Sequence, residues 1–473
     1  MKTRLFNTRA LIGLAGALLI GAILTPAGGA QAPALAPDEH FKYASVGIED
    51  EEGIPYWIWK AMPVVCASRL PSPADGYGSF GIITEPGHDL PVGFAKRSLF
   101  GGDRVAINCA FCHVAAVRTE PGAPRRLFLG APSNIVSPQD YSRFLQACAA
   151  SPEFTASNVL AAIEKLGGRP SFIERLTLRF LSVGAVRRGL KQQQDANQWM
   201  DPNPPWGPGR IDPFNRAKFV MLQLPVDGTI GNSDMMPIWN MGARKTPALH
   251  WDGLLHSPLR EAVLSSALGD GATPESIDLE SLARVEDWMM KVPPPRYPYP
   301  IDQALASSGR AIFDAQCAQC HTPGGARTGT VIPLSEVGTD RHRLDMWTTV
   351  AVTAYSAFAD DYPWDLKGFK KTDGYIAVPL DGLWLRAPYL HNGSVPYLPA
   401  LFEPVAQRPR VFYRGSEVYD PVRVGFVSEG PELERRGFKY DTSVKGNGNG
   451  GHLWGTELAP DQKRALVEFL KTM

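Results

Sequence analysis

Two short segments of the sequence carry a pair of cysteines followed directly by a histidine. Residues 109–113 read Cys-Ala-Phe-Cys-His, and residues 317–321 read Cys-Ala-Gln-Cys-His. Two thiols at this spacing can bond to the two vinyl groups on one edge of a porphyrin, while the adjoining histidine binds the iron. The alternative for either pair is a redox or zinc-binding Cys-x-x-Cys beside an incidental histidine. Because the complete pattern occurs twice, the sequence predicts two covalently bound c-type haems. Their attachment residues are Cys109, Cys112, Cys317 and Cys320, and their proximal ligands are His113 and His321.

The second axial ligand decides the role of each haem, because two protein ligands favour electron transfer and an open face permits chemistry on a small molecule. After the second motif, Met346 is the one methionine before the last residue, and it follows the motif closely, which disfavours a His/Met pair. The remaining candidates are a tyrosine, His342, His391 and His452. We favour His452, because the glycine and asparagine run over residues 446–451 lets the backbone approach a flat ring closely. For the first haem no single ligand stands out, as expected for an open or weakly held site.

The elements expected to position these motifs are mostly helices. Apolar residues at helical spacing predict helices across residues 140–195, across 309–320 and from Pro460 onward. Ser308 is the expected N-cap of the second, and residues 105–108 are predicted to form a short helix leading into the first motif. With 46 Gly and 42 Pro, much of the remainder is predicted to be loop. The predicted fold is mainly α with long ordered loops, arranged as two cytochrome c-like haem domains.

One loop-rich stretch, residues 202–247, is expected to shape the pocket over the first haem. It carries Met235, Met236 and Met241, for which core packing is favoured over iron ligation. Just beyond it, Trp251 lies between the two motifs in sequence and is a candidate for carrying electrons from one haem to the other.

The N-terminal residues have the pattern of a secretory signal. A basic start precedes an apolar run over residues 10–24, and small residues lead to an expected cleavage near Ala30 or Ala32. An uncleaved anchor is the alternative, although about fifteen apolar residues are short for a membrane span. No later run of the sequence is long and apolar enough to span a membrane. We therefore expect a periplasmic protein, in agreement with the attachment of c-type haems on the outer side of the bacterial inner membrane.

A proline-rich segment, residues 293–300, has the composition of a semi-rigid linker. The expected organisation is a signal peptide over residues 1–30, an N-terminal haem domain over 31–292, the linker, and a C-terminal electron-transfer domain over 301–473. The balance of 48 basic and 48 acidic residues gives no sign of a nucleic-acid partner. Cys66 and Cys148 lie outside the haem motifs, and the sequence leaves open whether they pair or remain separate buried thiols.

Four stretches of the chain together resemble one superfamily of haem proteins. They are residues 108–113, 250–253, 317–321 and 387–396. The resemblance is to the bacterial di-haem cytochrome c peroxidase and MauG superfamily, and more closely to its branch that contains the rubber oxygenase. It implies that the N-terminal haem is the reaction site and that the C-terminal haem transfers electrons. It also implies that Trp251 lies between the haems, that His452 is the distal ligand of a bis-histidine second haem, and that His391 supports the haem loop without binding iron.

The sequence departs from the peroxidase pattern where that family has a catalytic glutamate. The corresponding residues 267–274 contain Asp270 as the nearest acid, so Asp270 or Arg244 would have to take over the proton relay. The mobile histidine ligand of the peroxidases has no secure match, which favours a permanently open first haem.

The predicted function is that of an exported di-haem oxidoreductase of the cytochrome c peroxidase type. Hydrogen peroxide would be activated at the first haem, with electrons from a small redox protein, a cytochrome or a cupredoxin, arriving through the second. The alternatives are a dioxygen-dependent oxygenase that cleaves an organic substrate, and a non-catalytic electron carrier with both haems fully ligated. Whether calcium binds between the domains, and whether the chain forms a homodimer, remain open.

Overall fold

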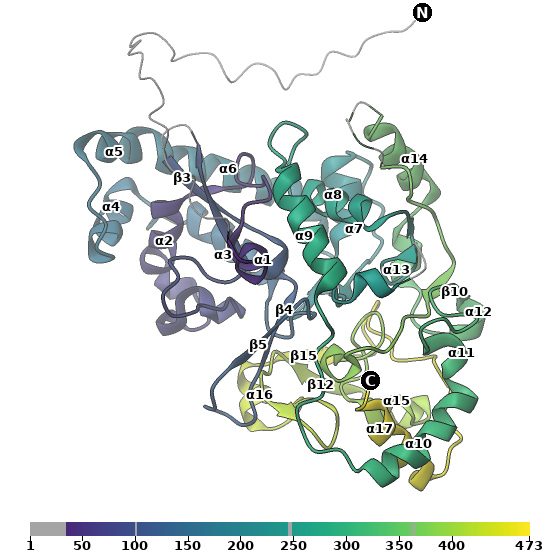
Figure 1. The fold of residues 1–473 in the computed structure, drawn as a ribbon. Coiled ribbons are helices and arrows are strands. Elements are labelled where there is room, and N and C mark those ends of the chain that lie inside the picture. The colour runs from purple at the N-terminus through teal and green to yellow at the C-terminus, as the bar shows by residue number, and fades with distance from the viewer. Residues whose placement is uncertain (1–34, 100–101, 245–247, 361, 363, 365) are drawn as a thin grey trace, which may run out of the picture. The chain divides into compact units, whose positions relative to one another are not determined.

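Helices and short paired strands alternate along the chain (Figure 1). The computed structural model describes residues 35–99, 102–244, 248–360, 362, 364 and 366–473, so the predicted signal peptide over residues 1–30 lies outside the described residues. Helices hold 42% of the structure and strands 13%, the latter in several small sheets. The prediction of a mainly α fold is therefore wrong. Gly- and Pro-rich stretches that cannot be helical still pair their backbone N–H and C=O groups where the chain folds back on itself.

A three-stranded sheet leads directly into the first Cys-x-x-Cys-His motif. Its strands, in spatial order, are β1 (Ile54–Pro55), β3 (Gly102–Ile107) and β2 (Phe94–Leu99). The prediction of a short helix over residues 105–108 is wrong, because Val105 in β3 pairs with Lys96 in β2. A β-branched residue such as Val105 suits a paired strand better than an isolated helical turn. After the motif comes an antiparallel pair, β4 (Val114–Val117) and β5 (Arg126–Leu129).

The N-terminal part contains six helices. They are α1 (Pro37–Tyr43), α2 (Tyr56–Val65), α3 (Pro138–Ala150), α4 (Ala156–Lys165), α5 (Phe172–Thr177) and α6 (Val183–Ala196). Of these, α2, α3, α4 and α6 contribute side chains to one buried apolar cluster. A π-helical turn, Leu178–Ser182, joins α5 to α6, and this series confirms the helices predicted across residues 140–195. A disulfide joins Cys66, directly after α2, to Cys148 of α3, with their Cα atoms 5.6 Å apart. The pairing that the sequence left open is therefore a crosslink.

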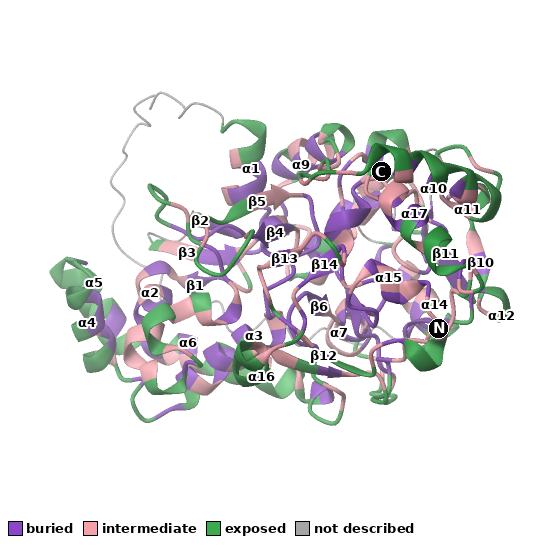
Figure 2. Cartoon of the chain, turned by 90° about the horizontal axis from the view of Figure 1, so that it is seen from below, coloured by how far each residue is buried: buried purple, intermediate pink, exposed green. Residues whose placement is uncertain are grey.

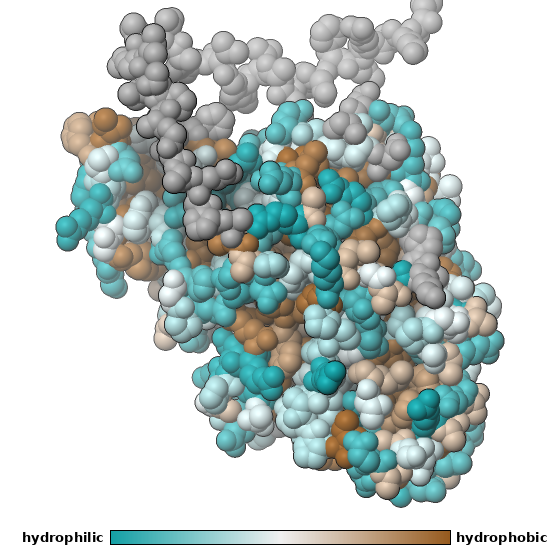
Figure 3. Space-filling model, in the orientation of Figure 1, coloured by the Kyte–Doolittle hydropathy of each residue, from teal (hydrophilic) through white to brown (hydrophobic). Residues whose placement is uncertain are grey.

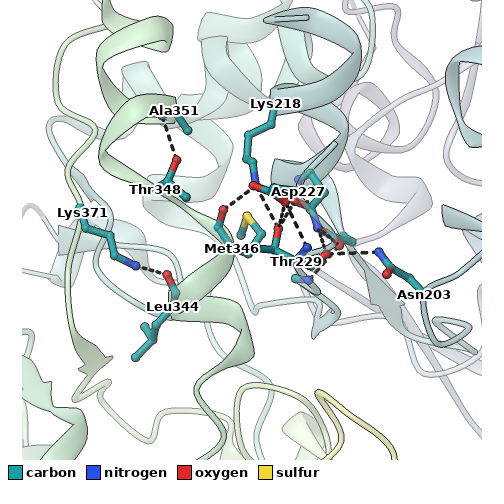
Figure 4. A network of polar contacts seen from close by, with 12 residues as sticks. Asn203, Lys218, Asp227, Thr229, Leu344, Met346, Thr348, Ala351 and Lys371 are labelled. Atoms are coloured by element: carbon teal, nitrogen blue, oxygen red, sulfur yellow. Dashed lines mark hydrogen bonds and ion pairs between the residues drawn. The ribbon is translucent and has the colours of Figure 1, made fainter. Parts of the chain in front are cut away.

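The loop-rich stretch over residues 202–247 is fastened by a buried lysine. It contains α7 (Pro213–Arg216) and the strand pair β6 (Arg210–Ile211) and β7 (Ser233–Asp234). The side chain of Lys218 is 1% exposed, and its Nζ donates to the carbonyl of Met346 at the end of α13 (His342–Met346) at 2.8 Å (Figure 4). It also donates to Asn215, Asp227 and Thr229. A buried ammonium group is stable only when it is paired in this way, so the network ties the loop to α13.

Two helices and a strand pair follow this loop. They are β8 (Ala248–Leu249), β9 (Leu255–His256), α8 (Leu259–Gly269) and α9 (Leu279–Lys291). Within the proline-rich residues 293–300 the chain forms neither helix nor strand, yet it is packed: the carbonyl of Pro295 accepts from Nε1 of Trp384 at 2.9 Å, and Tyr297 donates to the carbonyl of Pro421 at 2.8 Å. Contacts between residues group Pro37–Met473 into one unit. The division into two haem domains at this segment stays a prediction.

The C-terminal part is built on two helices that cross, α10 (Gln303–Gln316) and α17 (Pro460–Leu470) (Figure 1). The second begins at Pro460 as predicted. The first begins at Gln303 and is capped by Asp302, so the predicted N-cap at Ser308 is wrong, because Asp302 already accepts from the amide of Leu305. The other helices are α11 (Ala318–His321), α12 (Leu334–Val337), α14 (Thr349–Phe358), α15 (Leu398–Leu401) and α16 (Pro431–Arg436). The strand pairs are β10 (Val331–Pro333) with β11 (Gly374–Ile376), β12 (Val411–Arg414) with β15 (Phe438–Asp441), and β13 (Tyr419–Asp420) with β14 (Gly425–Phe426).

Candidate haem sites

The first motif presents its histidine with one ring nitrogen already engaged. Nδ1 of His113 lies 2.9 Å from the carbonyl oxygen of Met236. Because a carbonyl can only accept, Nδ1 carries the proton. Burial lowers the pKa of His113 to about 4, so the ring is neutral near pH 7. Nε2 of His113 therefore keeps a lone pair that can bind iron.

Met236 is a residue whose role in this site the sequence did not reveal. From the sequence it is expected to pack in the core through its thioether, whereas the structure engages its backbone carbonyl with His113. The two residues are 123 positions apart, and a carbonyl carries no residue-type signal. Only the folding of the loop over residues 202–247 brings this carbonyl to the ring.

Asp270 lies close enough to the first motif to act on its cysteines. Burial raises the pKa of Cys109 to about 12 and that of Cys112 well above its usual value, and the negative charge of Asp270 raises both further. Asp270 follows the last turn of α8 and keeps exposed surface, yet the dense protein around it raises its own pKa to about 6. Its neighbour Glu52 adds to this increase. An acid with a pKa near 6 can exchange a proton close to neutral pH.

The second motif is organised like the first. Nδ1 of His321 lies 2.7 Å from the carbonyl oxygen of Val378, so this ring also donates through Nδ1 and keeps Nε2 for iron. Burial lowers the pKa of His321, which keeps the ring neutral, and raises the pKa of the Cys317 thiol to about 11. Cys320 packs against a buried apolar cluster, and the partly buried Trp251 and Trp454 pack against the same cluster. These apolar side chains suit the face of a porphyrin.

His452 faces the proximal histidine of the second motif. The ring centres of His321 and His452 are 6.1 Å apart, with their planes 43° apart. Two metal–nitrogen bonds of about 2 Å each, with the short distance from each nitrogen to its ring centre, would place the centres of two axial imidazoles about 6 Å apart. Burial and the neighbouring His321 lower the pKa of His452 to about 3, so it is neutral and able to bind metal. The observed pair therefore fits one haem iron between two histidines.

The glycine-rich loop before His452 is held by side chains from elsewhere in the chain. A Cβ on Gly451, whose φ is +75°, would lie 2.3 Å from the carbonyl carbon of Gly338, so only glycine fits there. Arg408 donates to the carbonyls of Asn449 and Gly451 at 2.6 and 2.9 Å. Asn392, within the stretch 387–396, donates to two further carbonyls of the loop. These contacts hold the loop while Nδ1 of His452 itself has no hydrogen-bond partner among the described residues.

Trp251 connects the surroundings of the two motifs. Its Nε1 donates to the carbonyl of Asp234 at 2.7 Å, and its side chain packs on the apolar cluster that also contacts Cys320. Asp234 lies two residues before Met236, which accepts from His113. A short path of backbone and hydrogen bonds therefore runs from the indole of Trp251 to the first proximal histidine.

Arg244 lies beside Asp381 and Arg386, and the charge of Arg386 acts on the second proximal histidine, His321. Burial lowers the pKa of the Arg244 guanidinium, and Asp381 opposes this effect. Nε and Nη2 of Arg244 are buried without a hydrogen-bond partner in the part of the chain that the structure describes. The guanidinium groups of Arg244 and Arg386 beside the single carboxylate of Asp381 leave a net positive charge. A propionate group of a bound haem could therefore accept hydrogen bonds from the two nitrogens of Arg244. The structure thus groups Arg244 with the second motif, while Asp270 stands beside the first.

Among the described residues, no group of three or more His, Cys, Asp or Glu side chains could hold a metal ion by itself. A haem iron needs only one or two protein ligands, because the porphyrin supplies four. The two motif histidines and His452 thus match the donor set that haem requires.

The comparisons with known proteins point to a haem protein. The family described as RoxA-like, cytochrome c-like matches residues 374–413, which include Val378 and Asn392. The uncharacterized protein y4iM of Sinorhizobium fredii is 29% identical over 296 residues, covering 53% of this chain and 66% of that protein. The uncharacterized protein y4iJ of the same organism is 29% identical over 248 residues, covering 38% of this chain and 41% of that protein. The chain thus spans less than two thirds of the length of either relative. The match to residues 374–413 supports a cytochrome c-like haem family for this chain.

Proposed function

We propose that the chain is an exported di-haem c-type oxidoreductase that reduces hydrogen peroxide at the first motif, with electrons delivered through the second. The observation that carries this proposal is the difference between the two motifs. His321 faces a second histidine at 6.1 Å between ring centres. No histidine faces His113 in this way among the described residues, and the carboxyl group of Asp270 lies near the cysteines of its motif. A haem bound at each motif would supply an iron that exchanges single electrons and, where a face is open, binds peroxide or dioxygen.

Asp270 is the proposed proton carrier of the reaction. Reduction of peroxide to water requires two protons and two electrons, and cleavage of the O–O bond is faster when a nearby acid protonates the leaving oxygen. With a pKa raised to about 6, Asp270 can accept a proton from peroxide and return it to the departing oxygen near neutral pH. His113 remains neutral because burial lowers its pKa, and its contact with Met236 orients the ring so that Nε2 can hold the iron.

Trp251 is the proposed electron relay. It packs against the same apolar cluster as Cys320 and donates to the carbonyl of Asp234, two residues from the partner of His113. Electrons from a small redox protein, a cytochrome or a cupredoxin, would enter at the second motif and reach the first through this indole. Replacement of Trp251 by Phe is expected to slow reduction of the first haem by the second while both haems remain bound.

Export is supported by the disulfide between Cys66 and Cys148. Disulfides form and persist in oxidising compartments such as the bacterial periplasm and are rare in the cytosol. The predicted signal over residues 1–30 would direct the chain to such a compartment. Within the described ranges, no helix has both the length and the apolar character needed to cross a membrane.

A second candidate function is a dioxygen-dependent oxygenase that cleaves an organic substrate at the first haem. Two observations favour it: the match to the RoxA-like family and a cavity of about 860 Å³ lined by Leu127, Leu129 and Trp288 among others. Residues of β5 line this cavity, and Leu129 of β5 pairs with Val114, the residue after His113. The cavity is thus next to the first motif and large enough for an organic molecule.

Assays of the purified holoprotein separate these functions. The proposal expects peroxide-dependent oxidation of a reduced cytochrome c, together with a ferric spectrum that changes when cyanide or peroxide is added. Oxygen uptake with an unsaturated hydrocarbon and no added reductant would favour the oxygenase instead. A purely low-spin spectrum that neither ligand changes would contradict both and indicate an electron carrier.

A further inference from the structure

One helical segment carries large apolar side chains on its outside. In α5 and the π-helical turn after it, Phe172 is 75% exposed, Ile173 74%, Phe180 70%, Leu181 65% and Leu176 41%. Figure 3 shows the apolar colour gathered over α5, and Figure 2 shows α5 as exposed. Apolar side chains of this size rarely gather at the surface of a protein unless they contact something.

This apolar face is separate from the face that attaches the helix to the protein. Phe172, Leu176 and Phe180 stand on successive turns and therefore share one side of the helix. Leu178, Val183, Val186 and Leu190 are buried and anchor the helix in the N-terminal core. The extra residue of the π turn shifts the side-chain register between α5 and α6, so the two apolar faces do not merge. The buried face packs in the core of the protein, whereas the exposed apolar face is available to contact a partner.

The surroundings of this face are strongly basic. Residues 164–191 hold seven basic and two acidic residues, whereas the whole chain holds 48 of each. The exposed basic residues are Lys165, Arg169, Arg175, Arg179, Arg188 and Lys191. Arg179 lies against the outward-facing ring of Phe180, 5.7 Å from its centre, and Arg175 is paired with Glu164 at 2.6 Å. Apolar side chains bordered by arginines are typical of helices that lie in the interface of an anionic membrane.

We propose that the face formed by Phe172, Ile173, Leu176, Phe180 and Leu181 docks the protein on an anionic lipid membrane. The phenyl and aliphatic groups would enter the boundary between headgroups and acyl chains, and the arginines would contact lipid phosphates. The basic surroundings argue for lipid over a second copy of this chain, because two such faces would bring like charges together. This role is independent of the chemistry proposed for the haem motifs.

The test measures binding of the holoprotein to vesicles of equal parts phosphatidylglycerol and phosphatidylcholine by co-sedimentation. Wild-type protein is expected to bind these vesicles. Its affinity should fall at least tenfold at high salt, and its affinity for vesicles of pure phosphatidylcholine should be at least tenfold lower. The double variant Phe172→Ser with Phe180→Ser should lose at least tenfold in affinity, and Arg179→Glu with Arg188→Glu should lose a similar amount. The matched control is Val422→Ser, because Val422 is 79% exposed and lies on another part of the surface. This variant should bind the vesicles as tightly as wild-type protein does.

Any of three binding results would overturn the proposal. They are absence of binding to anionic vesicles, equal binding to both vesicle types, and unchanged binding of the double Phe variant. A wild-type dimer that this variant converts to a monomer would assign the face to a second copy of the chain and likewise overturn it. Thermal unfolding of each variant, expected to match wild type because the altered side chains are exposed, confirms that loss of binding is not loss of folding.

Discussion

Each proximal histidine is oriented by a neutral backbone carbonyl. His113 donates to Met236 and His321 donates to Val378, at 2.9 and 2.7 Å. A carboxylate in this position would make the imidazole more basic and stabilise ferric iron, whereas a carbonyl fixes the ring without adding charge. At the residue scale, the two motifs therefore offer iron the same proximal donor. The difference between them lies in a second group: His452 faces His321, whereas the first motif has Asp270 near its cysteines.

Replacement of His452 tests the assignment of the second haem. His452→Ala should convert the ferric second haem from low-spin to high-spin, because the iron loses its sixth ligand. His452→Met should keep it low-spin and raise its reduction potential by on the order of 0.1 V. Visible and electron paramagnetic resonance spectra check the first expectation and redox titration the second. His256→Ala is the control, because His256 is exposed, and an equal spectral change there would contradict the assignment.

Replacement of Asp270 tests the proton relay through the pH dependence of the reaction. The ionised carboxylate is the form that accepts a proton, so kcat/KM for peroxide should rise as pH increases through about 6 and level off above it. Asp270→Asn should lower kcat by about 10²–10⁴-fold and remove this pH step. Asp287→Asn, at an exposed carboxylate, serves as the control. A profile that falls above pH 6, or persists in Asp270→Asn, would show that another group carries the proton.

At the element scale, the second motif depends on a crossing of two helices. The motif follows α10 directly, and α10 packs on α17 with Gly309 at the crossing. A Cβ on Gly309 would lie 1.9 Å from the carbonyl oxygen of Ala465. Absence of a side chain there lets the helices approach closely and fixes where Cys317 begins. His452 lies eight residues before Pro460, the first residue of α17. The same helix crossing therefore affects the positions of both histidines that would bind the second iron.

Replacement of Gly309 by Ala should destabilise the protein by about 1–3 kcal/mol, because the added methyl group forces the helices apart. The matched control is Gly189→Ala in the interior of α6, where an added Cβ meets nothing within 4 Å. That change should stabilise the protein by about 0.5–1 kcal/mol, since alanine favours helix over glycine. Denaturant unfolding measures the free energy of unfolding of both variants and checks both expectations. Equal stability of the two variants would refute the role of the crossing.

At the scale of the whole molecule, Asp234 joins three distant parts of the chain. Its carbonyl accepts from Trp251, its amide donates to the carbonyl of His391 at 2.9 Å, and its carboxylate accepts from Arg414 at 2.8 Å. The loop over residues 202–247, the central tryptophan and the segment matched by the RoxA-like family thus meet at one residue. This meeting holds the surroundings of the two motifs together, which suits the electron transfer that we propose between them.

The disulfide acts at the same scale, because it closes a loop of the chain 82 residues long. Replacement of Cys66 and Cys148 together by Ala should lower the free energy of unfolding by about 2–4 kcal/mol, mainly by freeing the unfolded chain. Thiol reductant should reproduce this loss in wild-type protein and leave the variant unchanged, since the thioether bonds of c-type haem resist reduction. Thermal unfolding with and without reductant is the measurement. Insensitivity of wild-type protein to reductant would show that the crosslink contributes nothing.

The sequence alone determined the features that depend on residues adjacent in the chain. The two Cys-x-x-Cys-His motifs, the helices across residues 140–195 and the start of the last helix at Pro460 follow from local spacing and backbone preference. Tertiary structure decided what depends on distant partners: the strand that includes residues 105–107, the Cys66–Cys148 crosslink and the carbonyl of Met236 beside His113. The glycine-rich run before it and the resemblance to a family both indicated His452 for the second haem. Its 6.1 Å spacing from His321, however, comes from a loop held by side chains elsewhere in the chain. Strand pairs, disulfides and hydrogen bonds to backbone carbonyls form between residues that are far apart in the chain. The sequence around each residue does not show which distant segment it will contact.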